Sequence, residues 1–116
     1  MNYNYINTGY LEMVTGGSRE ITEELISIFR QQAEEFYQQM SHLFHNGNYK
    51  ELGLLAHKAK SSVAIMGMEG LASLLKELET KARTGLNSEN YSEVITKFHI
   101  ETSEAIKELE QYVSTL

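Results

Sequence analysis

Apolar residues recur every three or four positions along most of this chain, the spacing that gives a helix one apolar face. The 116 residues include no proline, and the glycines gather at a few points, so short breaks should separate the helices. We expect residues 1–6 to be loosely held, with Tyr3, Tyr5 and Ile6 packing on the bundle. We predict helices over residues 8–15, 19–46, 48–67, 69–84 and 89–114.

The apolar positions of each predicted helix define the face that should be buried. In the 19–46 helix they are Ile21, Leu25, Ile28, Phe29, Phe36, Met40, Leu43 and Phe44. In the other helices they are Leu11, Val14, Leu52, Leu55, Ala56, Ala59, Val63, Met66, Leu71, Leu74, Leu75, Leu78, Val94, Ile95, Phe98, Ile106, Leu109 and Val113. Ser18 should cap the 19–46 helix, and Asn48 with Glu51 should form a capping box that opens the next one.

Four long amphipathic helices with short connections pack most simply as an antiparallel up-and-down four-helix bundle. The short additional N-terminal helix should cover one end of this all-α bundle. A chain of 116 residues has the size of one domain. We therefore expect residues 1–116 to form a single helical bundle domain.

Composition excludes several classes of protein. All sixteen acidic residues are Glu and the net charge is −6, which argues against a nucleic-acid binder and against most carboxylate metal sites. The absence of cysteine removes disulfides and thiolate chemistry. No apolar run is long enough to span a membrane, and residues 1–5 do not have the pattern of a signal peptide. We expect a cytoplasmic protein.

One strip of the 48–67 helix has an unusual composition for a surface that faces water. It consists of Gly53, His57, Lys60, Ser61 and Ala64, and it lies opposite the apolar face. A glycine inside a helix costs roughly 1 kcal/mol relative to alanine. Small side chains around an imidazole would allow another protein to bring a reactive group close to the ring. Residues 48–66 also hold three lysines and one glutamate, a basic face that favours an anionic partner.

The residues that follow this histidine complete a recognisable pattern. A lysine lies three positions after His57, small residues follow, a glycine lies ten positions after it, and a leucine-rich helix ends in Leu-Glu. These positions are Lys60, Ser61, Ser62, Gly67, Leu71, Leu75, Leu78 and Glu79. The pattern resembles the histidine phosphotransfer (HPt) domain of multistep two-component phosphorelays. Upstream residues Tyr10–Leu11, Gly16–Gly17, Glu24–Leu25 and Phe29 are similar to that family's entry into its first long helix.

The resemblance implies a phosphocarrier. His57 would accept a phosphoryl group on Nε2 from the aspartyl phosphate of a receiver domain, Lys60 would neutralise it, and another receiver would take it on. The receiver-docking surface would consist of Gly53, Ser61, Ala64 and Gly67. Position 61 is usually Gly in the family and is Ser in this chain, which is still a small residue. The partners would be receiver domains of response regulators or hybrid sensor histidine kinases. The chain itself would be a monomer. It would need no cofactor of its own, because the receiver supplies Mg²⁺. It has no Gly-rich nucleotide loop and so would not be an ATP-dependent kinase.

Other functions remain open at this stage. The chain could be a helical adaptor or inhibitor module that binds a kinase or a receiver and whose His57 is never phosphorylated. His42 and His45 have a spacing that could ligate a metal, but no cysteine, aspartate or Glu-x-x-His motif accompanies them, so we expect no metal site. His99 should be a packed or edge histidine.

Overall fold

The computed structural model describes residues 3–116 and contains five helices and no strand within them. This confirms the prediction of an all-α protein, and the observed boundaries differ from the predicted ones by two residues at most. The helices are α1 (Thr8–Thr15), α2 (Arg19–His45), α3 (Tyr49–Ile65), α4 (Glu69–Ala82) and α5 (Asn90–Ser114).

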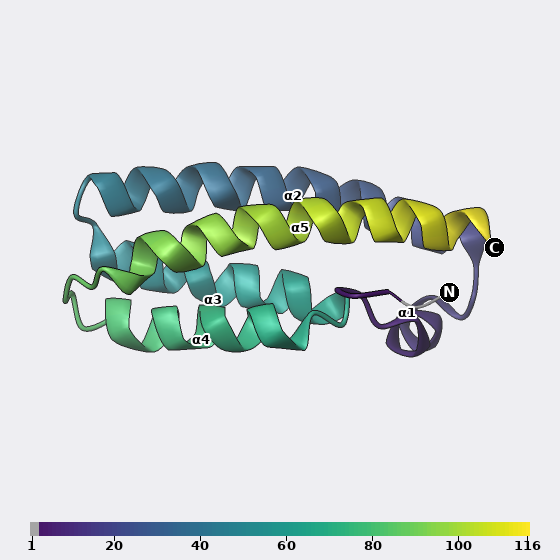
Figure 1. The fold of residues 1–116 in the computed structure, drawn as a ribbon, viewed down its shortest axis with the longest axis horizontal. Helices are drawn as coiled ribbons and strands as arrows, with labels where there is room; N and C mark the ends of the chain where they lie inside the picture. The colour runs from purple at the N-terminus through teal and green to yellow at the C-terminus, as the bar shows by residue number, and fades with distance from the viewer. Residues whose placement is uncertain (1–2) are drawn as a thin grey trace.

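The four long helices form an antiparallel bundle about 45 Å long and 20 Å wide (Figure 1). Each long helix packs against the next one in the chain, and α5 returns to pack along α2. Since α2 and α5 are longer than α3 and α4, they extend beyond them at one end. There α1 lies beside the projecting ends of α2 and α5 and covers that end of the bundle (Figure 1).

The predicted caps were half right. Ser18 accepts a hydrogen bond from the backbone N–H of Ile21 at 3.2 Å, as expected of a residue that opens a helix. The capping box of Asn48 is wrong: its side chain makes no capping hydrogen bond to α3. Instead the backbone N–H of Asn48 donates to the carbonyl of Leu43 at 2.9 Å, and Gly47 adopts a positive φ of 73°, so this residue takes part in ending α2.

The buried side chains form one continuous apolar cluster that all five helices share. Its inward face on α2 differs from the predicted one, because Ile21 and Ile28 are about half exposed and Thr22 and Ile26 are buried in their place. Thr22 can be buried since its hydroxyl donates to the carbonyl of Ser18 at 2.6 Å, which satisfies the polar group. Val14 on α1 is likewise exposed rather than buried. Exposed apolar residues such as Ile21, Ile28 and Val14 make the buried face hard to predict from the positions of apolar residues alone.

The segment before α1 is held against the bundle. The prediction of a loose segment was therefore wrong for residues 3–6, but the predicted packing of Tyr3, Tyr5 and Ile6 on the bundle is confirmed. Residues 1–2 lie outside the described part. The backbone N–H groups of Asn4, Tyr5 and Ile6 all donate to the carboxylate of Glu108 on α5, over 2.8–3.2 Å. Ile6 is buried, and the ring of Tyr3 meets Tyr112 edge to face.

Candidate functional site

The hairpin of α3 and α4 carries the residues singled out by the sequence. The chain turns at Met66–Met68, and Gly67 adopts a φ of 78°, which an L side chain rarely tolerates. His57 lies nine residues before Met66, and Glu79 lies ten residues after Glu69. Because the two helices run antiparallel with the same rise per residue, these two side chains come level with each other across the hairpin.

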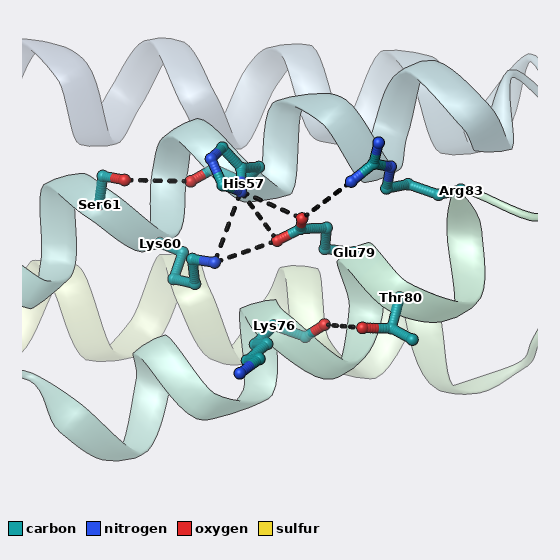
Figure 2. Close-up of polar contacts among 7 residues, drawn as sticks. All are labelled: His57, Lys60, Ser61, Lys76, Glu79, Thr80 and Arg83. Carbon is teal, nitrogen blue, oxygen red and sulfur yellow. Dashed lines mark hydrogen bonds and ion pairs between the residues drawn. The ribbon is translucent and has the colours of Figure 1, made fainter.

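The His57 side chain is partly exposed to solvent and contacts Glu79 on α4. Its side chain is 58% exposed, and its Nδ1 lies 3.0 Å and 3.1 Å from the two carboxylate oxygens of Glu79 (Figure 2). An ionised carboxylate can only accept hydrogen bonds, so the Nδ1 of a neutral ring must carry the proton. The lone pair then remains on Nε2, which is the nitrogen free to react.

Glu79 is the centre of a small ionic cluster. Its side chain is only 11% exposed, and it is the one charged residue buried among residues 3–116. Lys60 Nζ lies 3.2 Å from Oε1 and 3.5 Å from His57 Nδ1, while an Arg83 guanidinium nitrogen lies 3.4 Å from Oε2 (Figure 2). Burial by itself would raise the pKa of Glu79, but hydrogen bonds from His57 and Lys60, together with their charges, outweigh it and lower the pKa. The carboxylate therefore stays ionised at neutral pH and holds the imidazole in one orientation.

The surface around His57 is open on the side away from Glu79. Ser61 and Ala64, one and two turns further along α3, are both exposed, as the sequence predicted. The Ser61 hydroxyl turns back to the carbonyl of His57 at 3.4 Å (Figure 2). Ser62 points instead toward α2, where its hydroxyl donates to Gln32 at 3.0 Å. Small or backbone-bonded side chains thus leave the ring accessible from solvent.

Gly53 does not lie on this open surface, so its predicted place in the docking strip is wrong. The residue is buried where α3 meets α4. A Cβ atom added there would lie 2.8 Å from Cγ and 2.9 Å from the backbone nitrogen of Arg83, distances that Cβ atoms do not tolerate. The glycine therefore allows the two helices, and the stem of Arg83, to approach each other closely.

Gly67 also has a structural reason that differs from the predicted one. The space beside its Cα is filled by Asn7, since an added Cβ would lie 2.5 Å from the Asn7 Cβ. Asn7 is the N-cap of α1, and its backbone N–H donates to the carbonyl of Met66. Gly67 is ten residues from the histidine, about 15 Å along a helix axis. It fits the N-terminal segment against the hairpin, and its part in receiver docking stays a prediction.

His42 and His99 contact residues outside the cluster around His57. His42 Nε2 lies 3.0 Å from the side-chain amide of Asn46, one turn away. His99 is half buried and stacks on Tyr37 with ring centroids 4.0 Å apart, which agrees with the prediction of a packed or edge histidine. In residues 3–116 no three His, Cys, Asp or Glu side chains lie together as metal ligands would. None of the helices described has the length and apolar character to cross a membrane.

Comparison with protein families shows to which family the chain belongs. The family model of the Hpt domain matches residues 24–115, most of the chain. The chain belongs to the Hpt family. This Hpt domain is therefore a histidine phosphotransfer domain of the phosphorelay type, a class of phosphocarriers that work with receiver domains. The family assignment was predicted correctly from the pattern around His57.

Comparison with solved structures shows the same fold. The crystal structure of histidine-containing phosphotransfer protein B (HptB) from Pseudomonas aeruginosa PAO1 is similar to this Hpt domain, with a TM-score of 0.87. The match covers 99% of each chain at 21% sequence identity. A search of curated proteins found no match.

Two residues of the cluster had no predicted role. In the sequence pattern Glu79 is only the end of the leucine-rich helix, and the pattern does not extend to Arg83. A signal for Glu79 existed, because it shares the buried stripe of α4 with Leu71, Leu75 and Leu78, where a charged side chain needs a partner. For Arg83 the sequence held no signal, since its position depends on how closely α3 and α4 approach.

Proposed function

We propose that His57 is the phosphoacceptor of this Hpt domain: it accepts a phosphoryl group on Nε2 from one receiver domain and passes it to another. The contact between Glu79 and Nδ1 is the observation that carries the proposal. It leaves the nucleophilic nitrogen facing solvent on a ring whose orientation is already fixed, and such preorganisation is what phosphoryl transfer asks of the acceptor.

The proposed step needs no proton transfer at the reacting nitrogen. The Nε2 lone pair attacks the phosphorus of the receiver's aspartyl phosphate, an N–P bond forms, and the P–O bond breaks with its electron pair left on the aspartate carboxylate. Nδ1 keeps its proton on the Glu79 side throughout. The ring thereby becomes a phosphoimidazolium, and the ionised Glu79 beside it stabilises the new positive charge. The reverse step hands the group to the next receiver.

The other participants in the proposal follow from the charges of the site. Lys60 is the cation nearest the ring and would neutralise the transferred group. The receiver would bring Mg²⁺ and the acidic pocket that binds it, so this chain needs no cofactor and no ATP site of its own. Ser61 and Ala64 would lie in the docking surface as exposed small residues. We propose that the chain acts as a monomer, with receivers of response regulators or hybrid histidine kinases as partners.

Phosphoryl exchange with receiver domains tests this function. Receivers from the same genome are first phosphorylated with acetyl phosphate and Mg²⁺, then mixed with the wild-type chain or with His57→Gln. We expect at least one receiver to transfer its phosphoryl group to the wild type, none to the variant, and none to either chain from ATP alone. Unchanged transfer to His57→Gln would contradict the assignment of the acceptor. Binding of a receiver without any transfer would favour the adaptor alternative.

A further inference from the structure

Lys60 lies on the Nδ1 side of the His57 ring, next to Glu79. Its ammonium is bonded to Glu79 at 3.2 Å and lies beside Nδ1, whereas the proposed phosphoryl group forms on Nε2. The Lys60 side chain is 25% exposed and carries a flexible four-carbon stem, so it can change partners. A phosphoryl group with nearly two negative charges attracts an ammonium more strongly than a carboxylate that is already shared among three donors.

If Lys60 leaves, Glu79 loses a cation while remaining buried. A buried carboxylate without compensation is costly, and that cost would hold Lys60 in place. Arg83 changes this balance because it bonds the other oxygen of Glu79, at 3.4 Å, from the solvent side of α4. The two cations thus divide the carboxylate between them, and Arg83 can remain when Lys60 moves (Figure 2).

The backbone of α3 is shaped to hold Arg83 where it is. The stem of Arg83 crosses α3 at Gly53, one turn before His57, and any larger residue at position 53 would meet its Cγ. Gly53 is the one glycine in the interior of α3, where it lowers helix stability by roughly 1 kcal/mol relative to alanine. The glycine at position 53, although unfavourable for the helix, gives the Arg83 side chain the space it needs to reach Glu79.

We propose that Lys60 exchanges Glu79 for the phosphoryl group when His57 is phosphorylated, and that Arg83 is the positioning residue that keeps Glu79 paired during the exchange. This inference rests on the proposed function of His57. It gives Arg83 a role in the phosphorylated state without contact to the phosphoryl group. Lys60 then serves both states of the histidine.

A mutant cycle on the phosphorylated protein tests the exchange. Wild type, Arg83→Gln, Lys60→Ala and the double variant are phosphorylated with phosphoramidate, and the half-life of the phosphohistidine is followed by ³¹P NMR. We expect Arg83→Gln to shorten the half-life about two- to fivefold, the range of an exposed ion pair. The double variant should decay no faster than Lys60→Ala, because Arg83 acts only by releasing Lys60. Arg83→Lys should restore most of the lifetime.

Two controls separate this role from a general effect on charge or folding. Lys76→Gln removes a cation from the same helix, and Figure 2 shows the Lys76 amine directed away from Glu79, so its half-life should match wild type. In a Glu79→Gln background, Arg83→Gln should have no effect, since a neutral amide does not retain Lys60. In the wild type, the ¹⁵Nζ resonance of Lys60 should shift on phosphorylation.

The contradicting outcomes are distinct. Arg83→Gln indistinguishable from Lys76→Gln, or effects of Arg83 and Lys60 that multiply in the double variant, would overturn the exchange alone. An Arg83 effect that persists without the Glu79 carboxylate would assign it a merely structural role. A folded wild type that takes up no phosphoryl group on His57 would overturn the proposed function and this inference together.

Discussion

At the scale of single residues, the site depends on one buried charge. His57 and Lys60 could be predicted because their spacing on one helix is visible in the sequence. The position of Glu79 on the buried stripe of α4 could be predicted from the sequence. Whether Glu79 lies opposite His57, however, depends on the length of the turn between the two helices. Gly53 was assigned to the wrong surface, because a missing side chain has the same appearance in a sequence whether it clears a docking site or a helix contact.

The ionised state of Glu79 should be visible in the pH dependence of stability. Its pKa is lowered in the folded state, so its stabilising contribution is complete above the pKa of an unfolded Glu, about 4.3. This contribution is lost as the pH falls below that value and through the lower pKa of the folded state. We predict that urea unfolding shows wild type more stable than Glu79→Gln at pH 7, with the difference shrinking as the pH falls below about 4.3. Glu77→Gln, exposed on the same helix, should change little; a Glu79 difference independent of pH would contradict the account.

The two glycines at positions 53 and 70 give a matched pair for the packing of α3 on α4. Alanine at position 53 would force its Cβ against Arg83, and we predict a net loss of roughly 1–2 kcal/mol after the gain in helix propensity. The Cβ of an alanine at position 70 of α4 would meet no atom within 4 Å, so Gly70→Ala should raise the free energy of unfolding by up to about 1 kcal/mol. Urea unfolding measures both, and a stabilising Gly53→Ala would show that the close approach is not required.

At the scale of elements, periodicity predicted five helices and their order because each long helix carries its own apolar stripe. It did not predict the hydrogen bonds that hold the N-terminal segment, since the backbone N–H groups of Asn4, Tyr5 and Ile6 bind Glu108 more than 100 residues away. The failed cap at Asn48 has a similar origin. The same residue lies between two helices, and the end of α2 determined its conformation.

Glu108 should determine the protection of the N-terminal segment. We predict that Glu108→Gln speeds hydrogen exchange at the amides of Asn4, Tyr5 and Ile6 by about tenfold, because a charged acceptor of three N–H groups becomes a neutral one. The matched control is Glu104→Gln, one turn earlier on α5, whose partner is the exposed Lys107. Equal exchange in wild type and Glu108→Gln would mean that the buried Ile6 alone anchors the segment.

At the scale of the whole molecule, the bundle presents a histidine whose side chain is 58% exposed on α3. An exposed acceptor suits a family that works with receiver domains, and in our proposal the receiver supplies the rest of the active site. The sequence predicted this division of labour through its pattern. It contains no information that identifies the receiver.

Docking and chemistry should be separable on this surface. Ala64→Arg places a long cation two turns from His57 on the exposed face of α3. We predict phosphorylation by phosphoramidate within about twofold of wild type, but transfer from a receiver slowed at least about tenfold by the steric clash. Ser103→Arg, exposed on α5, is the control for added charge. An equal rate of receiver transfer in Ala64→Arg and Ser103→Arg would place the docking surface elsewhere.

The assignment of His57 as the phosphoacceptor is the central claim, and the intact mass after incubation with phosphoramidate tests it most directly. The wild type should gain the mass of one acid-labile phosphoryl group, while His57→Gln should gain none and keep the helicity of the wild type. His42, His45 and His99 remain in the variant, so the comparison isolates one ring. An adduct on His57→Gln, or none on a folded wild type, would contradict the account.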